Sequence, residues 1–460
     1  MPAGRAGARR RARAEPERVT GVVPSVAAAR PGPRRIAAAE LPPRVALLAP
    51  NGPAWIAARD AVTVAGEMLV PLNPRLAPPE IAELLARARP HRVLADPALA
   101  DRLPTGVAWE PVDRVRPARE PLRHEIGATL LFTSGTTGRP KACVRGAACE
   151  RARAEELIAT YAIGPRDVHL VACPLSHSAP GIFLRAARAA GAETVVLPRF
   201  SAESFLAAVE RHRATLFFLV PTQIERLLAL PASVRDRYDL TSVRCAIVAG
   251  APFPPARKRA AIDWLGHGRL WEFYGSTETG TVAVCRPEEH LERPGSVGRP
   301  PPDVQIRTID GELYVRSPAV MDGYLEDEPA VVDGYVTVGD LGRIDGDGYV
   351  HLVDRKHDTI ITGGVNVYPA EVERALAELP GVRGAVVCGI DDPDWGQIVA
   401  AVVCANGSED ELRAQLRARI APYKIPKRIA FVDAEALPVG SSGKPLRRRA
   451  RDWFARGARR

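Results

Sequence analysis

The sequence has no run of 18 consecutive apolar residues, so no integral membrane segment is expected. Its seven cysteines are scattered and form no C-x-x-C pair. Such an odd, unclustered set is typical of reduced thiols that are buried as small apolar side chains in a cytosolic protein. The N-terminus lacks the apolar core of a secretory signal, whereas its Arg- and Ala-rich composition leaves a transit peptide open. We therefore expect a cytoplasmic protein.

Lysine is scarce, because only six of the 63 basic residues are lysine. Two of the six, Lys141 and Lys444, fall inside phosphate-type motifs, which suggests that they are there for chemistry. The net charge of +9 comes from two arginine-rich ends, residues 1–14 and 444–460, whereas residues 15–443 are slightly acidic. No aromatic residue interleaves the basic N-terminal segment for base stacking, so nucleic acid is not an expected partner.

The chain of 460 residues is longer than one hydrophobic core usually serves, so two or three domains are expected. Residues 1–43 are dominated by Ala, Arg, Gly and Pro and are expected to be a disordered or divergent N-terminal segment. From Arg44 strands and helices alternate, with a helix expected from Pro78 to Arg89 and a strand from Arg92 to Ala95. This alternation predicts an α/β large N-terminal domain over 44–355, with mostly parallel sheets, flanking helices and a small β subdomain. The pattern of residues 356–460 predicts a small α+β C-terminal domain.

The stretch from Leu131 to Lys141 reads L-F-T-S-G-T-T-G-R-P-K and follows an apolar run that predicts a strand. Glycines let the backbone approach an anion, hydroxyls donate to phosphate oxygens, and a lysine adds charge suited to a polyphosphate. A flexible surface loop would have a similar composition, and a Walker A loop does not fit because two residues separate Gly138 from Lys141. The stretch resembles the phosphate loop of the adenylate-forming superfamily, which includes acyl-CoA synthetases, carrier-loading adenylation domains and luciferases. The phosphate-binding candidates are Thr133, Ser134, Gly135, Thr136, Thr137, Gly138 and Lys141.

A second motif, Tyr274-Gly275-Ser276-Thr277-Glu278, follows a predicted strand. An aromatic ring can stack on adenine, a hydroxyl can bind an α-phosphate and a carboxylate can take Mg²⁺. By itself the motif would more readily be a turn with a solvated glutamate, but together with the phosphate loop it resembles the superfamily's Y-G-x-T-E motif. The resemblance implies that Tyr274 stacks on adenine beside Gly275, that Thr277 contacts phosphate and that Glu278 ligates the metal. It also implies that Gly250, Ala251 and Pro252 line the adenine and acyl pockets.

The same resemblance assigns further positions. His177, in P-L-S-H, matches the residue that gates entry of ATP and substrate, although a lone structural histidine would also fit. Asp340 matches the aspartate that binds the ribose hydroxyls, with Val338 in place of the usual threonine, and Arg355 matches an arginine on the ribose. His357 takes the hinge position, where Lys or Asp is usual, and its titration would make the domain rotation sensitive to pH.

Two motifs of the C-terminal domain complete the set. Residues 361–369 resemble the loop that lines the pantetheine tunnel, where Gly363 and Gly364 would let a thin thiol arm pass close to the backbone; a β-turn into the next helix is compatible with this. Residues 438–444 resemble the P-x-x-x-S-G-K motif, whose lysine, here Lys444, bridges carboxylate and α-phosphate during adenylation.

The resemblance covers roughly residues 44–450 and implies an AMP-forming acid–thiol ligase that uses ATP, Mg²⁺ and coenzyme A. A small-molecule carboxylic acid would become an acyl-adenylate with loss of pyrophosphate, and the small domain would then rotate so that the thiol takes the acyl group. The catalytic candidates are Lys444, Thr277, Glu278 and His177. The absence of an acidic residue that selects a substrate amine favours a fatty, aryl or steroid-type acid. An enzyme that loads an acyl carrier protein or another nucleophile is the second interpretation. A nucleotide-binding regulator with a degenerate site is the third.

Overall fold

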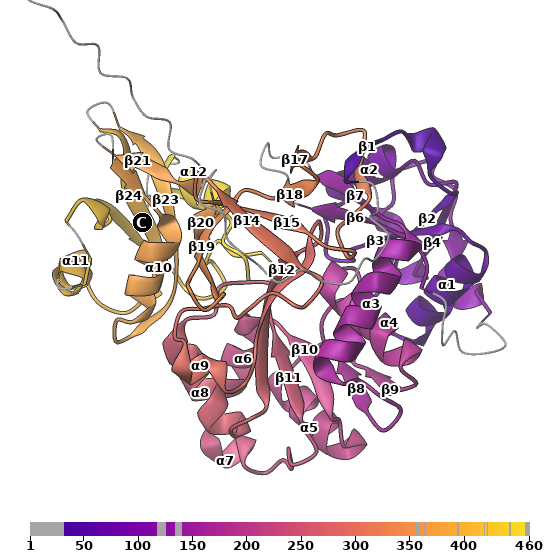
Figure 1. The fold of residues 1–460 in the computed structure, drawn as a ribbon, viewed down its shortest axis with the longest axis horizontal. Helices are drawn as coiled ribbons and strands as arrows, with labels where there is room; N and C mark the ends of the chain where they lie inside the picture. Colours follow the sequence, from indigo (N-terminus) through magenta and orange to yellow (C-terminus); the bar gives the residue numbers. More distant parts are fainter. Residues whose placement is uncertain are drawn as a thin grey trace, which may run out of the picture.

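The computed structural model describes residues 32–116, 126–133, 140–355, 358–362, 365–392, 395–417, 419–420, 422–440 and 443–455. A large domain with two sheets carries a smaller domain at one side, next to a small antiparallel sheet (Figure 1). This architecture confirms the predicted α/β large domain and the α+β small domain. None of the helices that the structure describes is long and apolar enough to cross a membrane.

The first sheet of the large domain has the strand order β1-β16-β7-β6-β3-β2-β4-β5. Its strands are β1 (Arg34–Ile36), β16 (Gly323–Leu325), β7 (Lys141–Arg145), β6 (Thr129–Thr133), β3 (Met68–Leu72), β2 (Arg44–Leu48), β4 (Arg92–Ala95) and β5 (Glu110–Pro111). Strands β3, β2 and β4 are parallel and almost wholly buried, as expected for short apolar runs covered on both faces.

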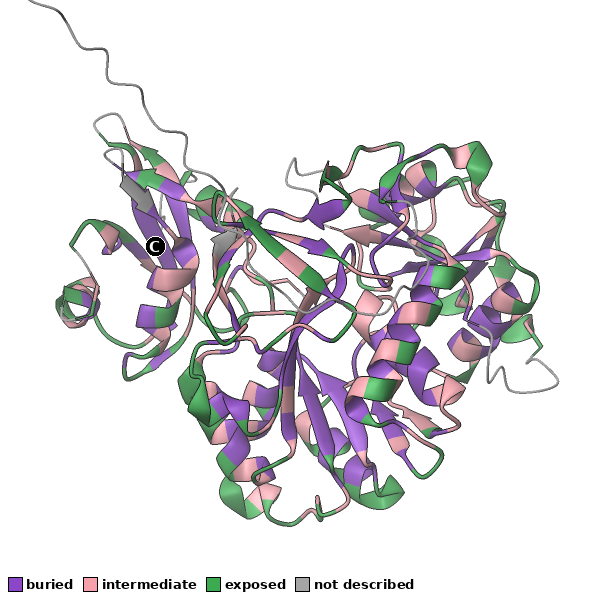
Figure 2. Cartoon of the chain, in the orientation of Figure 1, coloured by how far each residue is buried: buried purple, intermediate pink, exposed green. Residues whose placement is uncertain are grey.

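The second sheet has the order β13-β12-β11-β10-β8-β9 and is parallel except for the β12–β13 pair. Its strands are β8 (Val168–Val171), β9 (Glu193–Val196), β10 (Leu216–Leu219), β11 (Cys245–Val248), β12 (Leu270–Ser276) and β13 (Gly280–Cys285). The purple strands at the centre of Figure 2 show that this sheet is the buried core of the large domain.

Helices cover both faces of both sheets. Between the sheets lie α1 (Pro53–Val64), α3 (Ala147–Tyr161) and α4 (Ser178–Ala189). Outside them lie α2 (Pro78–Ala88) on the first sheet and α5 (Ala202–His212), α6 (Pro221–Leu228) and α8 (Pro255–Leu265) on the second, with short α7 (Ala232–Arg235) and α9 (Glu289–Glu292). The middle layer therefore touches residues of both sheets, and several of its polar side chains, such as Arg59, Glu150 and Arg185, are buried.

The predicted β subdomain is confirmed as an antiparallel sheet of order β17-β18-β15-β19-β20, with β14 paired to β15. Its strands are β14 (Gln305–Ile309), β15 (Glu312–Arg316), β17 (Ala330–Val332), β18 (Tyr335–Thr337), β19 (Asp340–Ile344) and β20 (Val350–Arg355). Strand β16 leaves this subdomain and inserts between β7 and β1 of the first sheet.

The expectation that order begins at Arg44 was wrong. The described structure begins at Gly32, and β1 pairs in parallel with β16, joining residues 34–36 to residues 323–325. The three residues of β1 are too few to show a hydrophobic period, and the partner strand β16 comes almost 300 residues later in the sequence. The boundary at 355–356 stays a prediction because residues 356–357 lie outside the described part.

The small domain is built on a sheet of order β22-β21-β24-β23, with β25 paired to β24. Its elements are β21 (Ile360–Thr362), β22 (Val365–Val367), α10 (Pro369–Ala377), β23 (Val382–Asp392), β24 (Gly396–Ala405), α11 (Glu409–Arg417), β25 (Arg428–Phe431) and α12 (Arg447–Ala455). Helices α10 and α11 pack on one face and α12 on the other. All seven cysteines of the chain are buried and free, as expected.

Candidate active site

The predicted site residues that the structure describes gather where strands of the two sheets end. Gly250, Ala251 and Pro252 follow β11, and the Y-G-S-T-E motif closes β12. Thr133 and Lys141 are register partners at the open end of the β6–β7 pair. Ligands of open α/β sheets bind beyond the carboxyl ends of the strands, which is where these segments meet.

Some predicted residues lie outside the described part of the chain. They are Ser134, Gly135, Thr136, Thr137 and Gly138 of the phosphate loop, the hinge residue His357, and Gly363 and Gly364 of the tunnel loop. Their roles stay predictions.

Glu278 has a defined hydroxyl partner. Its carboxylate Oε1 accepts a hydrogen bond of 3.0 Å from Tyr324 Oη, and Lys141 Nζ lies 4.9 Å from the centroid of the same tyrosine ring. Burial and the nearby Glu278 carboxylate raise the pKa of Tyr324 well above its ordinary value, so the phenol stays a donor. A carboxylate, a phenol and an ammonium group therefore come together from the turn after β12, from β16 and from β7.

The turn that carries Glu278 is ordered by its own hydroxyls. Ser276 Oγ accepts hydrogen bonds of 3.1 Å from the backbone N–H groups of Glu278 and Thr279. Gly275 is required here, because a Cβ at this position would lie 2.1 Å from the carbonyl oxygen of Gly280. The local sequence thus builds a tight turn that presents Thr277 and Glu278 at the end of the strand.

A buried arginine fixes the same turn from below. Arg145 Nη1 donates to the Thr277 carbonyl at 2.7 Å, Nη2 donates to the Ala319 carbonyl at 2.7 Å, and Nε lies 3.2 Å from Glu150 Oε1. Although burial opposes it, the neighbouring Arg185 and Arg145 lower the pKa of Glu150 to about 2, so this carboxylate is charged. The guanidinium ties the first sheet to the Thr277 turn.

Tyr274 and Asp340 meet directly. Tyr274 Oη donates to Asp340 Oδ2 at 2.6 Å, and Asp340 at the start of β19 faces Arg355 at the end of β20 in the strand register. The predicted adenine-stacking residue and both predicted ribose-binding positions therefore come to one corner of the site. Val338 stands where threonine is usual, and the hydrogen bond between Tyr274 and Asp340 forms with valine at this position.

His177 is the N-cap residue of α4 and is partly buried, with its Nε2 atom shielded from solvent. Burial, Lys444 and Arg75 together lower its pKa to about 4, so the imidazole is neutral at physiological pH. A gate made of a neutral ring can approach Lys444 without charge repulsion.

Lys444, in the small domain, lies near His177. It is exposed, and its ammonium is close enough to His177 to act on the pKa of the imidazole. The preceding Gly443 has φ +77°, and a Cβ there would lie 2.7 Å from Thr222 Cγ2 at the start of α6. Only glycine lets the P-x-x-x-S-G-K motif sit this close to the large domain.

Sequence reasoning missed Tyr324, Arg145 and Arg75. Tyr324 lies in a three-residue strand without a periodic pattern. Arg145 and Glu150 look like ordinary surface charges until the two sheets enclose them. Apolar neighbours on both sides of Arg145 in A-C-V-R-G are the one available signal, because they suggest a strand that is buried on both faces.

The donor set fits a nucleotide and a hard cation. Glu278 is buried, and a buried carboxylate needs a compensating charge. The motif around it supplies oxygen atoms, which Mg²⁺ prefers, and Lys141 lies nearby for phosphate oxygens. These residues would hold the nucleotide and its magnesium ion.

Comparisons with known proteins agree with this arrangement. The model of the AMP-binding enzyme family matches residues 40–325, and that of the AMP-binding enzyme C-terminal domain matches residues 371–444. A feruloyl-CoA synthase from an Amycolatopsis species is 35% identical over 445 residues, with 89% of each chain covered.

Two solved structures are similar over most of the chain. The amide bond synthetase of Marinactinospora thermotolerans has a TM-score of 0.78 at 32% identity, with 90% of each chain covered. The o-succinylbenzoate coenzyme A synthetase of Bacillus subtilis, in complex with ATP and magnesium ion, has a TM-score of 0.77 at 29% identity, with 88% of each chain covered.

Proposed function

The chain belongs to the AMP-binding enzyme family, and we propose that it is a coenzyme A ligase for a ring-bearing, aryl-type carboxylic acid. As an AMP-forming acid ligase it activates the acid with ATP, releases pyrophosphate and transfers the acyl group to the thiol of coenzyme A. The observation that carries the proposal is the meeting of Glu278, Tyr324 and Lys141.

In the first half-reaction a carboxylate oxygen of the acid attacks the α-phosphorus of ATP and pyrophosphate leaves. Magnesium, when bound at Glu278, neutralises phosphate charge and polarises the phosphoryl oxygens. Lys444 adds its charge from the small domain, and Lys141 adds its own from β7. Because the carboxylate is already a nucleophile, the residues of this chain contribute positioning and electrostatic stabilisation.

Tyr274, Asp340 and Arg355 hold the nucleoside in this proposal. The Tyr274 hydrogen bond fixes one Asp340 oxygen, and the carboxylate keeps further lone pairs for the ribose hydroxyls. Thr277 offers a hydroxyl to the α-phosphate from a turn that Arg145 holds in place.

In the second half-reaction the thiol sulfur attacks the acyl carbon and AMP leaves. The P-x-x-x-S-G-K motif must withdraw from Thr222 to clear the site, and Gly363 and Gly364 would then line the path of the thiol. The neutral His177 leaves at the same time without breaking an ion pair, because its imidazole is uncharged at physiological pH.

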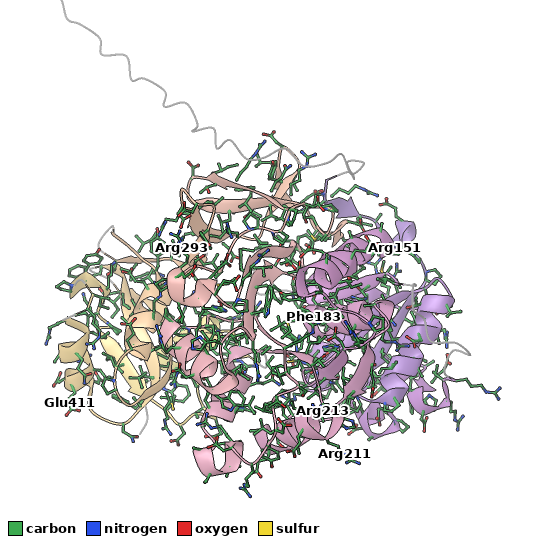
Figure 3. All side chains as sticks on the ribbon, turned by 60° about the horizontal axis from the view of Figure 1, so that its bottom comes forward. Arg151, Phe183, Arg211, Arg213, Arg293 and Glu411 are labelled. Carbon is green, nitrogen blue, oxygen red and sulfur yellow. The ribbon has the colours of Figure 1, made fainter. Side chains whose placement is uncertain are left out.

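An aromatic wall supports the aryl class of substrate. Phe183 of α4 stacks on Phe218 of β10 with ring centroids 5.5 Å apart and an interplanar angle of 15°, and Phe273 of β12 lies 6.0 Å from both. Phe183 lies in the interior of the large domain, well away from surface residues such as Arg211 (Figure 3). The three rings are almost fully buried in the core of the second sheet, and Phe273 directly precedes Tyr274 in β12, so in this proposal they support the acyl pocket from the core.

The test is pyrophosphate release over a panel of carboxylic acids, with and without coenzyme A. Hydroxycinnamic, arylacetic, steroid-type, fatty and short-chain acids separate the acyl classes. Turnover that needs coenzyme A and prefers ring-bearing acids is expected. A primary amine is tested as a second acceptor, because the chain is similar to an amide bond synthetase. A phosphopantetheinylated carrier protein is tested as a third acceptor. A preference for fatty acids would overturn the aryl assignment.

A further inference from the structure

We propose that the large domain holds a single monatomic anion of the halide type in a small cavity that His177 helps to line. The cavity lies between α1, β3, β6 and the inner face of α4. It is distinct from the aromatic wall, because Phe183 is on another face of α4 and does not line it.

The cavity has room for one small guest. Its volume is about 20 Å³, which is enough for the centre of one water-sized particle and too small for a carboxylate with its chain. Trp55 and Arg59 of α1 and Arg185 of α4 line it, and their exposed fractions are 3%, 3% and 6%.

Two residues that line this cavity each carry a donor without a protein acceptor. Among the described residues, the indole Nε1 of Trp55 and the Nε of Arg185 are buried and without a hydrogen-bond partner. Both groups can only donate. A buried donor without an acceptor costs about 1–3 kcal/mol, so the fold gains when an acceptor in the cavity is within reach of them.

The surrounding charge is positive. Asp60 is shared by Arg59 at 2.7 Å and Arg188 at 2.8 Å, and Glu150 is shared by Arg185 at 3.0 Å and Arg145 at 3.2 Å. Four buried or mostly buried guanidinium groups thus face two carboxylates.

A fifth guanidinium, Arg153, is buried in the same layer and donates to Ser178 Oγ at 2.7 Å. Glu156 is a third carboxylate of this layer, and burial raises its pKa to about 7. Even when Glu156 is counted as charged, the five guanidinium groups outnumber the three carboxylates. Burial and the nearby Arg185 lower the pKa of Arg59 to about 10, in keeping with uncompensated positive charge at the cavity.

A halide fits these features better than water. His177 Nε2 is a third buried atom without a hydrogen-bond partner among the described lining residues, and in the Nε2–H tautomer it also donates. With that tautomer a water molecule would bring two hydrogen atoms of its own to three donors, whereas an anion accepts from each N–H group that points at it. A negative charge would also offset the excess of guanidinium charge, which an uncharged water molecule cannot do.

The first experiment is crystallographic. Crystals of the full chain are soaked in sodium bromide, and data are collected at the bromine absorption edge. An anomalous peak between Trp55 and Arg185 is expected in the wild type and in Trp109→Phe, whose indole is on the surface. Trp55→Phe keeps the ring and removes the N–H, so the peak should weaken or vanish. An absence of anomalous signal in the cavity of the wild type, or a bromide bound only at the phosphate loop, would overturn the proposal.

The second experiment works in solution. The melting temperature is measured in sodium bromide and in sodium glutamate at equal ionic strength, since glutamate is too large for the cavity. A saturable rise of roughly 2 °C in bromide is expected for the wild type and Trp109→Phe, and none for Trp55→Phe. If Trp55→Phe fails to fold, the proposal is tested by the wild-type melting temperatures in the two salts and by the wild-type anomalous map. Equal melting curves in both salts would count against an anion.

Discussion

The phenol of Tyr324 donates its hydrogen bond to a carboxylate, Glu278, that belongs to the other sheet of the large domain. The 3.0 Å contact joins β16 to the turn after β12 and places the ring beneath Lys141. The position of the metal-binding candidate therefore depends on a strand of three residues that is remote in sequence.

Tyr324→Phe removes the hydroxyl and keeps the ring for Lys141. A hydrogen bond to a charged group contributes about 1.5–3 kcal/mol, so we expect adenylation to slow by about tenfold or more. Pyrophosphate release at a series of magnesium concentrations is the measurement. Tyr335→Phe, which removes a hydroxyl bonded to Gln305 outside the site, is the matched control. Unchanged rates in Tyr324→Phe would show that Glu278 needs no partner.

Lys444→Ala should separate the two half-reactions. A charge used only in the transition state of adenylation contributes about 3–4 kcal/mol, which is about two to three decades in rate. Thioester formation from preformed acyl-adenylate should be spared. Lys427→Ala, on an exposed lysine of the same domain that lies over Trp395, serves as the control. An equal loss in both half-reactions would contradict the domain-rotation mechanism.

His177 should contribute to acid sensitivity. Burial, Lys444 and Arg75 hold its pKa at about 4, below the ordinary value near 6.5 of the unfolded chain. The unfolded state therefore binds more protons between about pH 6.5 and 4, and stability falls as the pH drops through this window.

Between pH 7 and pH 5 the free energy of unfolding of the wild type falls, and in His177→Asn this fall should be smaller by about 1–2 kcal/mol. Part of the fall remains in the variant, because burial also lowers the pKa of His169 and of His290 to about 4. Melting temperatures at the two pH values are compared, and the exposed His212→Asn should behave as wild type. If His177→Asn loses as much stability as the wild type between pH 7 and pH 5, His177 is not the residue whose titration lowers the stability.

A chain that starts at Arg44 should be less stable than one that starts at Gly32. The shorter chain lacks β1 and exposes the edge of β16, which carries Tyr324. We expect a melting temperature lower by several degrees and weaker adenylation, because β16 loses its parallel partner. Thermal melts and pyrophosphate release on both chains test this. Equal behaviour of the two chains would make β1 dispensable.

Phe183→Leu should change the preferred acid. The shorter side chain opens space beside Phe218 and Phe273, so longer or bulkier acids should gain up to about tenfold in relative kcat/KM. A stability loss of about 1 kcal/mol is expected. Phe205→Leu, which disturbs a separate aromatic pair with Phe217, controls for general loosening of the core. An unchanged acid preference would remove Phe183 from the acyl pocket.

Local patterns predicted much of the fold. The apolar run at Arg44 is β2, and the expected strand at residues 92–95 is β4 with the same bounds. The helix expected from Pro78 is α2, which ends one residue earlier than predicted. These elements follow from hydrophobic periodicity and from Gly and Pro at their ends, and both signals lie within the segment itself.

Tertiary relationships could not be predicted in this way. Nothing near Tyr324 indicates that its strand leaves the β subdomain for the first sheet. Arg145 and Glu150 have the spacing of a surface pair, and only the packing of two sheets around α3 makes them buried. Motif resemblance assigned Tyr274 and Asp340 to one nucleotide site, and in the structure the two side chains share a hydrogen bond. The closeness of Gly443 to Thr222 depends on how the two domains sit.

The insertion of β16 has a consequence for synthesis of the chain on the ribosome. The first sheet ends at β7 until residues 323–325 have emerged, so during most of translation β7 presents an unpaired edge. The second sheet can form earlier, because its strands are close in sequence. The large domain therefore has a late closing step with high contact order, and nascent chains stopped before β16 would be the species prone to edge-to-edge association.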